Sequence, residues 1–115
     1  MKNQEAILAF SALAQETRLN IFRLLVRAGP EGLAAGRIAE LLDKNPSALS
    51  FHFKEMAIAG LVHVRQEGRF VVYGANYDAV HGLVGFLMEH CCEGAESPAR
   101  VSGKSSCGTG KKKAK

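Results

Sequence analysis

The spacing of the hydrophobic residues in this chain changes once, at Gly60. Upstream of Gly60 the apolar residues recur every three or four positions, which is the period of an amphipathic helix. Downstream, the segments "LVHVRQ" and "RFVVYGA" alternate apolar and polar residues, which is the period of a β-strand. The "EG" between them predicts a hairpin that turns at Glu67-Gly68. A series of helices that ends in a hairpin leaves few folds open to the chain.

Four helices are expected before the hairpin. Their predicted ranges are residues 6–14, 16–26, 34–43 and 46–59. The second is apolar over so wide a face that we expect a central, mostly buried helix. The short turn "DKN" that joins the third helix to the fourth is typical of a helix-turn-helix pair. Asn45 is a favourable N-cap, Pro46 suits the first position of a helix, and Gly60 suits its C-terminal end.

A last helix is expected over residues 77–90, and the composition changes after it. Beyond residue 92 the chain is rich in Gly, Ser, Lys and Ala and has almost no large apolar side chains. Such a segment cannot bury enough surface to fold, so we expect residues 93–115 to form a flexible tail that carries Cys107. Residues 1–92 are expected to form one domain. The predicted fold class is mainly α with a two-stranded β-hairpin, the winged helix-turn-helix.

The net charge of +4 belongs to the tail and not to the domain. Residues 1–90 hold nine basic and nine acidic side chains, whereas residues 91–115 hold six basic and two acidic ones. DNA binding therefore has to be argued from local pattern and not from the isoelectric point. The chain has no run of about 18 apolar residues, and its start lacks the cleavage site of a signal peptide. We expect a cytoplasmic protein with no membrane partner, in a reducing environment where free thiols persist.

The predicted helix over residues 46–59 has one face for the core and one for a ligand. Leu49, Phe53 and Met56 follow one another at helical spacing and are expected to be buried. The opposite face carries Ser47, Ala48, Ser50, Phe51, Lys54 and Glu55. Short hydroxyl side chains near the start of a helix reach base edges or phosphates in a major groove, and a lysine can neutralise a phosphate.

The hairpin adds basic side chains beside its turn. Arg65, Gln66 and Arg69 flank the predicted turn, so the tip of the hairpin can lie against the DNA backbone. Taken singly these features are weak, because a serine near a helix start is more often a cap and an arginine beside a turn is more often only solvated. The order of the elements is what favours a DNA-reading surface.

Three segments, "SALAQETRLNIFRLLV", "PSALSFHFKEMAIAGLV" and "VRQEGRFVVY", resemble the ArsR (ArsR/SmtB) family of bacterial metal-responsive repressors. The resemblance runs from about residue 6 to about residue 90. Its specific part is the spacing of Ser47, Ser50 and His52, followed by the Arg-x-Glu-Gly-Arg hairpin. The chain departs from the family at Gln15-Glu16, where many relatives have an acidic residue and then proline, and at Phe53, where relatives usually have leucine. The predicted DNA-binding residues are Ser47, Ser50, Phe51, His52, Lys54, Arg65 and Arg69.

The resemblance implies a homodimer, clamped by its first and last helices, that sits on a palindromic operator in double-stranded DNA and blocks transcription. No cofactor is expected to be required for DNA binding. The apolar surface left over after one small core is filled needs a partner. The residues expected to bury that interface are Ile7, Leu8, Phe10, Leu13, Val80, Leu83, Val84 and Leu87.

The sensing sites of the founding family members are absent or mismatched. Those members hold a Cys-x-Cys pair on the helix before the recognition helix, where this chain has "GLAAGRIAELL". A second family site binds zinc through an Asp-x-His pattern on the last helix. Here Asp78 and His81 are three apart, as are His90 and Glu93, so the residue types agree with that site and the spacing does not.

Cys91 and Cys92 are adjacent, and adjacency limits what they can do. A disulfide between neighbours departs from the preferred geometry. Neighbours on a regular helix point about 100° apart, so both sulfurs reach one ion only where the helix frays, which Gly94 permits. Two thiolates bind a soft ion, and Cys107 can supply a third to complete a pyramidal site on trivalent arsenic or antimony.

Some ArsR relatives carry such a pair at the end of the last helix and respond to arsenite, antimonite or methylated arsenite. The resemblance therefore implies a repressor that releases its operator when trivalent arsenic or antimony, acting as inducer, binds Cys91, Cys92 and Cys107. The alternatives are a methylarsenite-selective repressor that uses only Cys91 and Cys92, a thiol-redox repressor, a zinc-responsive one, and a pair of unliganded thiols. No enzyme is predicted, because seven residues separate Cys92 from Arg100 instead of the five of a Cys-x5-Arg loop, and no other catalytic motif is present.

Overall fold

The structure, a computed structural model, describes residues 1–94 and contains in them five helices and a three-stranded antiparallel sheet. The elements are α1 (Asn3–Leu13), α2 (Glu16–Ala28), β1 (Leu33–Ala34), α3 (Ala35–Leu42), α4 (Pro46–Ile58), β2 (Val62–Glu67), β3 (Phe70–Ala75) and α5 (Tyr77–Met88). The predicted mainly helical, winged helix-turn-helix architecture is confirmed, with α3 and α4 as the helix-turn-helix pair. Within residues 1–94, no helix is long and apolar enough to cross a membrane.

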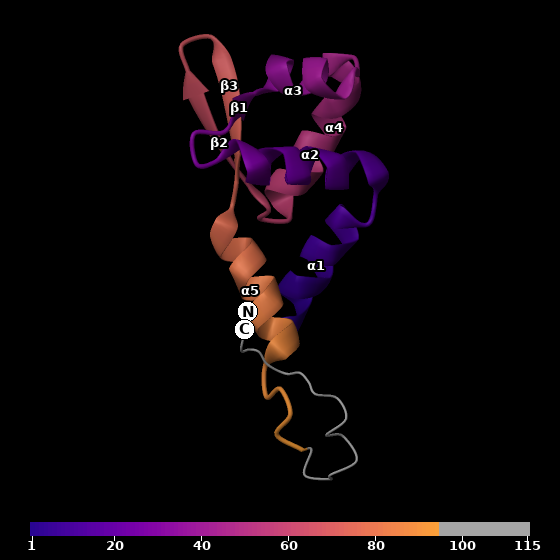
Figure 1. Ribbon diagram of the computed structural model, residues 1–115. Helices are drawn as coiled ribbons and strands as arrows, with labels where there is room; N and C mark the ends of the chain where they lie inside the picture. Colours follow the sequence, from indigo (N-terminus) through magenta and orange to yellow (C-terminus); the bar gives the residue numbers. More distant parts are fainter. Residues whose placement is uncertain (95–115) are drawn as a thin grey trace.

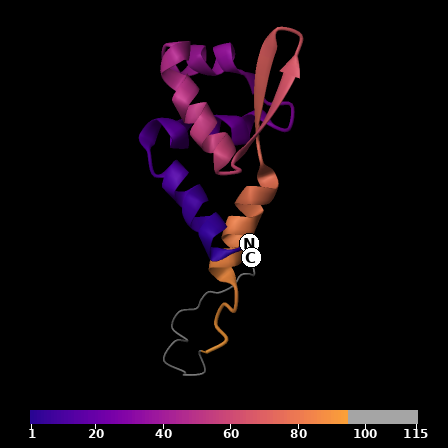
Figure 2. The same cartoon turned by 180° about the vertical axis from the view of Figure 1, so that it is seen from behind.

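Helix α2 separates the molecule into two parts (Figure 1). The helix-turn-helix pair and the hairpin of β2 and β3 lie on one side of it. On the other side α1 and α5 run away from the hairpin and approach each other, as the view from behind also shows (Figure 2). The expected central position of α2 is confirmed by its fully buried Ile21 and Leu25 and by Phe22, which is 7% exposed. The expectation of a mostly buried helix was wrong, because the Leu19 and Val26 side chains at the edges of its apolar face are 42% and 39% exposed. Each such side chain contributes about 1.5–3 kcal/mol by leaving water.

Both ends of α4 are fixed by local hydrogen bonds. The Asn45 side chain accepts from the Ser47 amide at 2.9 Å, and Pro46 occupies the first turn, as predicted. At the other end Gly60 has φ +78°, and the Leu61 amide donates back to the Met56 carbonyl at 3.0 Å. This left-handed glycine turn directs the chain from the helix into β2.

The sheet differs from the prediction in two respects. Its hairpin turns at Gly68-Arg69, one residue later than predicted, because Glu67 still pairs with Phe70 and Gly68 adopts φ +62°. A third strand, β1, pairs with β3 and was not predicted, since two residues are too few to reveal an alternating pattern. The Phe53 ring of α4 stacks on Tyr73 of β3 with ring centroids 4.2 Å apart, which attaches the sheet to the recognition helix.

The last helix ends at Met88, two residues before the predicted end. His90 and Cys92 both have positive φ, at 59° and 67°, so the chain is no longer an α-helix where it reaches the cysteines. The predicted tail begins at residue 93, and most of it, including Cys107, lies outside the described residues.

Candidate nucleic-acid interface and cysteine site

Helix α4 presents the face that the sequence predicts. Leu49, Phe53 and Met56 are 1%, 4% and 0% exposed and point into the core. The side chains expected to read DNA lie on the outer side of the same helix. Ser47, Ser50, Phe51 and Lys54 are exposed, and His52 is half-buried. Phe51 is 60% exposed, so part of its ring is accessible on the outer side of α4.

Ser47 also takes part in the helix cap. Its hydroxyl donates to the Asn45 side-chain oxygen at 2.8 Å, the same atom that accepts from the Ser47 amide. The hydroxyl proton is therefore used, and the oxygen lone pairs remain for a donor such as a cytosine or adenine amino group. Capping and DNA contact are compatible at this position.

His52 is held from the side by an arginine of another helix. Arg18, in the first turn of α2, donates from Nε to Nδ1 of His52 at 3.1 Å. Partial burial, and after it the charges of Arg18 and Lys44, lower the pKa of His52 below its usual value. The neutral ring then carries its proton on Nε2, where it can donate to a base or a phosphate. Arg18 was missed in the sequence, because no local pattern links it to a residue 34 positions away.

The two arginines of the hairpin have different surroundings. Arg65 donates to the Glu67 carboxylate and to the Glu31 carbonyl at 2.7 Å, so it ties the hairpin to the segment before β1. Arg69 lies in the turn itself and is exposed. Among residues 1–94, Arg65 is thus held by intramolecular bonds, whereas no ion pair or side-chain hydrogen bond includes Arg69.

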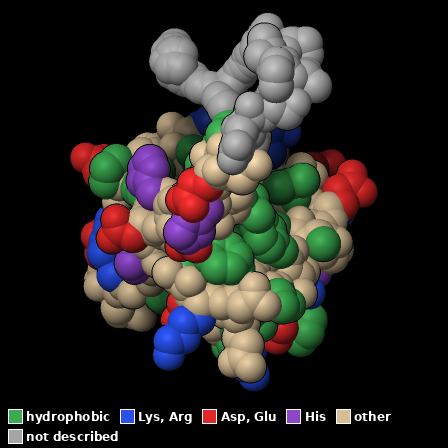
Figure 3. Space-filling view, turned by 90° about the horizontal axis from the view of Figure 1, so that it is seen from below, with side chains coloured by type: hydrophobic (Ala, Val, Ile, Leu, Met, Phe, Trp, Pro, Cys, Tyr) green, Lys and Arg blue, Asp and Glu red, His purple; other side chains and the backbone are tan. Residues whose placement is uncertain are grey.

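Hydrophobic side chains gather on part of the end of the molecule formed by α1 and α5, beside histidine and acidic side chains (Figure 3). Most side chains predicted for the interface are exposed there: Ile7 57%, Leu8 46%, Phe10 39%, Val84 56% and Leu87 64%. Leu83 is only 5% exposed and belongs to the core of the protomer, so its assignment to the interface was wrong. Leu13 and Val80 are partly buried against the same core. Hydrophobic side chains exposed together in this way mark a surface that a partner covers.

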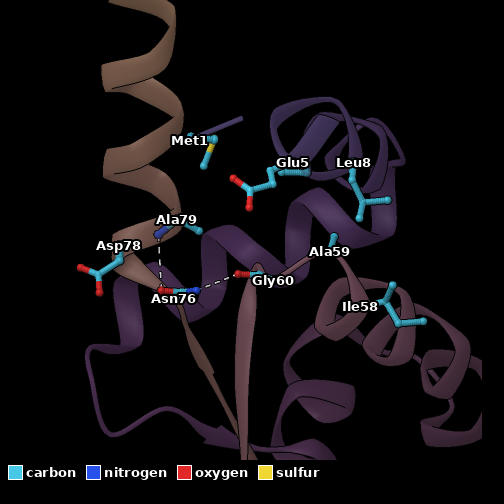
Figure 4. A pocket seen from close by; sticks show the side chains of 10 residues that line it. Met1, Glu5, Leu8, Ile58, Ala59, Gly60, Asn76, Asp78 and Ala79 are labelled. Atoms are coloured by element: carbon cyan, nitrogen blue, oxygen red, sulfur yellow. Dashed lines mark hydrogen bonds between the residues drawn. The ribbon is translucent and has the colours of Figure 1, made fainter. Parts of the chain in front are cut away.

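An open pocket of about 430 Å³ lies where α1, the end of α4 and the start of α5 meet (Figure 4). Asn76 crosses this junction. Its side-chain amide nitrogen donates to the Gly60 carbonyl at 2.8 Å, and its side-chain oxygen accepts from the Ala79 backbone amide at 3.4 Å. Asn76 therefore joins the first turn of α5 to the loop that ends α4.

The adjacent cysteines lie beyond α5 and face each other. Their Sγ atoms are 3.3 Å apart, and both residues are exposed. The left-handed φ of Cys92 turns the two side chains to the same side, as a regular helix does not. Beside them Nδ1 of His90 lies 2.6 Å from the Glu93 carboxylate. In the part of the chain that is described, no three His, Cys, Asp or Glu side chains of one protomer gather as a metal site.

Comparison with known proteins connects these features to transcriptional regulators. A family model described as a helix-turn-helix domain matches residues 13–65. The chain is 43% identical over 63 residues to the putative arsenical resistance operon repressor ArsR of Halobacterium salinarum, which covers 55% of this chain and 48% of that protein. It is 38% identical to the uncharacterized HTH-type transcriptional regulator YceK of Bacillus subtilis, over 68% of this chain and 78% of the relative. It is 29% identical to the transcriptional activator HlyU of Vibrio cholerae, over 77% of this chain and 80% of that protein. The chain thus spans about half the length of the Halobacterium protein.

Solved structures share the fold. An ArsR-like transcriptional regulator from Rhodococcus sp. RHA1 has a TM-score of 0.65 at 27% identity, covering 86% of this chain and 88% of that one. Reduced HlyU from Vibrio cholerae has a TM-score of 0.61 at 29% identity, covering 77% and 90%. A homodimeric winged helix-turn-helix DNA-binding domain from Mycobacterium bovis, a possible ArsR-family regulator, has a TM-score of 0.61 at 25% identity, covering 82% and 87%. The architecture of this chain is that of a family of DNA-binding regulators.

Proposed function

This chain belongs to the ArsR family of helix-turn-helix transcriptional regulators, and from that premise we propose that it is a repressor which leaves its operator when trivalent arsenic or antimony binds its cysteines. Its chemistry is binding and not catalysis, as in the relatives, which are named as transcriptional regulators. The observation that carries the sensing part is the 3.3 Å separation of the Cys91 and Cys92 sulfurs.

DNA binding follows from the exposed face of α4. In a winged helix-turn-helix the recognition helix lies in the major groove, with its N-terminal residues against the base edges. Ser47, Ser50, Phe51 and His52 occupy that part of α4 and supply hydroxyl, aromatic and imidazole groups. Lys54 and the wing residue Arg69 are placed to contact phosphates, which position the protein without reading sequence. No cofactor takes part in these contacts.

The protein acts as a homodimer through α1 and α5. The exposed apolar side chains belong to two helices that converge at the end of the protomer away from the hairpin (Figure 1). A two-fold axis through that end presents two copies of α4 to the same side of a duplex, and the operator is then palindromic. The homodimeric state of the similar Mycobacterium bovis domain supports this arrangement.

The cysteine pair fits a pyramidal metalloid. With bonds of about 2.3 Å, the length of a zinc–thiolate bond, sulfurs 3.3 Å apart subtend about 90° at a shared ion. That angle suits a trivalent arsenic or antimony centre whose lone pair fills one direction, and it is narrower than the tetrahedral angle of zinc. Thiolates are the ligands that soft ions prefer. Cys107 is the proposed third ligand and lies outside the described residues.

The path from the cysteines to DNA runs through α5. The two cysteines follow the last turn of this helix, and Asn76 joins its first turn to the end of α4. A ligand that reorients α5 changes the dimer interface and the angle between the two recognition helices. Release requires a coupling of about 1–3 kcal/mol, which is a change of about 5–150-fold in operator affinity.

The test is a titration of the operator complex under reducing conditions, with arsenite, antimonite and methylarsenite in turn. Wild type should dissociate, and Cys91→Ser should stay bound. Cys107→Ser should lose the arsenite response and keep the methylarsenite response, because methylarsenite has only two exchangeable positions. His81→Ala is the matched control and should respond as wild type does. A wild-type complex that ignores all three metalloids contradicts the proposal, and a response abolished by His81→Ala indicates zinc-type sensing.

A thiol-redox repressor is the second candidate. It is favoured by the contact between the Cys91 and Cys92 sulfurs and by the similarity to HlyU, which has been solved in a reduced form. Peroxide in chelated buffer separates the two functions. A redox sensor releases DNA with peroxide and rebinds with a dithiol, whereas a metalloid sensor releases DNA with arsenite in the presence of excess monothiol.

A further inference from the structure

Arg18 is a cation without a carboxylate partner. It is half-buried in the first turn of α2, and none of the ion pairs formed by residues 1–94 includes it. With no carboxylate beside it among the described residues, its charge is available to an anion from outside the protein.

The guanidinium is also held in place. Its Nε donates to Nδ1 of His52 at 3.1 Å, and its central carbon lies 5.8 Å from the centroid of the Phe51 ring. Arg18 is thus fixed against Phe51 and His52, two consecutive residues of the recognition helix, and Phe51 is 60% exposed. An arginine has five N–H donors, and the bond to His52 uses one of them.

The surroundings of Arg18 attract an anion. Lys44 lies close enough to act on His52 electrostatically, and the first turn of α4 contains no acidic residue. Two cations and the positive end of the α4 dipole therefore occur together at the edge of the surface that α4 presents. Because the side chain is already ordered, binding an anion there costs little additional entropy.

We propose that Arg18 binds a DNA phosphate beside the groove that α4 enters, and that His52 is the positioning residue which holds its guanidinium there. This inference rests on the DNA-binding function and does not depend on which inducer is sensed. Arg18 joins the interface from outside the helix-turn-helix pair. His52 has a double role, since Nδ1 orients Arg18 while Nε2 faces away from it.

The salt dependence of DNA binding measures such a contact. The logarithm of the binding constant falls with the logarithm of the salt concentration by about 0.9 for each phosphate neutralised. A mixed-sequence duplex of about 30 base pairs, longer than two half-sites one turn apart, serves as the probe because phosphate contacts do not depend on sequence. Arg18→Ala should reduce the slope by about 0.9 for each bound protomer. Arg23→Ala removes the same charge from an exposed position on α2 and should leave the slope unchanged.

Two substitutions of His52 separate positioning from folding. His52→Leu removes the acceptor and should shift the slope towards that of Arg18→Ala. His52→Asn places an oxygen where Nδ1 stands and should keep the wild-type slope, even if affinity for one sequence falls. In an Arg18→Ala background, His52→Leu should change the slope no further. If Arg18→Ala does not fold, Arg18→Gln carries the same expectation.

The inference is overturned if Arg18→Ala keeps the wild-type slope, if Arg23→Ala lowers it equally, or if His52→Leu acts independently of Arg18. A folded wild-type protein that binds no duplex at any salt concentration overturns the DNA-binding function itself. The two failures are therefore distinguishable.

Discussion

Replacing Gly32 by alanine should detach the hairpin from the rest of the domain. Gly32 has φ +73°, and a Cβ built on it would lie 2.2 Å from the Tyr73 carbonyl oxygen and 2.9 Å from its carbon. Both obstacles are backbone atoms of the middle strand, which cannot rotate away as a side chain can. Tyr73 pairs with Leu33 on one side and with Val64 on the other, so its displacement disturbs both halves of the sheet.

The magnitude follows from three contributions. Left-handed backbone costs a residue with a side chain about 1–2 kcal/mol. Loss of one sheet hydrogen bond costs about 0.5–1.5 kcal/mol. The stacking of Tyr73 on Phe53 contributes a similar amount beyond its burial. Gly32→Ala should therefore lower the free energy of unfolding by about 3 kcal/mol, and Tm by more than about 12 °C for a domain of this size.

Two other glycines are matched controls. Gly68 has φ +62° but no atom within 4 Å of its Cβ position, so Gly68→Ala should lose only the backbone contribution of about 1–2 kcal/mol. Gly36 lies in α3, and a Cβ built on it also meets no atom within 4 Å. Gly36→Ala should therefore stabilise the domain by about 0.5–1 kcal/mol. Thermal unfolding followed by circular dichroism gives all three values. Equal losses for Gly32→Ala and Gly68→Ala would show that the close approach to Tyr73 is unimportant.

Three further predictions test other parts of the molecule. Leu87 is 64% exposed, so Leu87→Glu should leave the protomer folded and convert the dimer to monomer in sedimentation at micromolar concentration. Asn76→Ala removes an N-cap and the bond to the Gly60 carbonyl, and should cost about 1–2 kcal/mol in urea unfolding. Because the pKa of His52 is lowered in the folded state, the unfolded chain binds more protons as the pH falls below 6.5. The free energy of unfolding should therefore decrease with falling pH in that window, and His52→Leu should remove this part of the decrease.

Elements whose signals are local were predicted well from the sequence. The start and end of α4 depend on Asn45, Pro46 and Gly60, which act within a few residues of the helix. The buried face of α4 depends only on helical spacing. The fold class follows from these elements, because the order of helices and hairpin allows few arrangements, whereas the DNA contacts assigned to α4 stay a prediction.

Features that depend on distant residues were not predicted. The strand β1 exists because Leu33 and Ala34 meet β3, and neither residue has a strand pattern of its own. Arg18 approaches His52 only after α2 and α4 have packed. Leu83 has the same spacing as its exposed neighbours on α5, and only the packed core shows that it faces inward. Sequence periodicity identifies a face, and tertiary packing decides which residues at its border are buried.

A repressor of this kind must also obey reciprocity between its two sites. The cysteines follow the end of α5, and the Asn76 junction joins the start of α5 to the end of α4, so the two proposed sites are separated by the length of α5. If arsenite lowers operator affinity by a factor of about 5–150, operator DNA must lower arsenite affinity by the same factor. Titration of arsenite into the free protein and into the protein saturated with operator, followed by thiolate absorbance, gives the second factor, and the DNA titration gives the first. Equal factors are expected. If arsenite dissociates the operator but DNA leaves arsenite affinity unchanged, release is not an equilibrium coupling, and arsenite acts through an irreversible step such as cross-linking or aggregation of the protein instead.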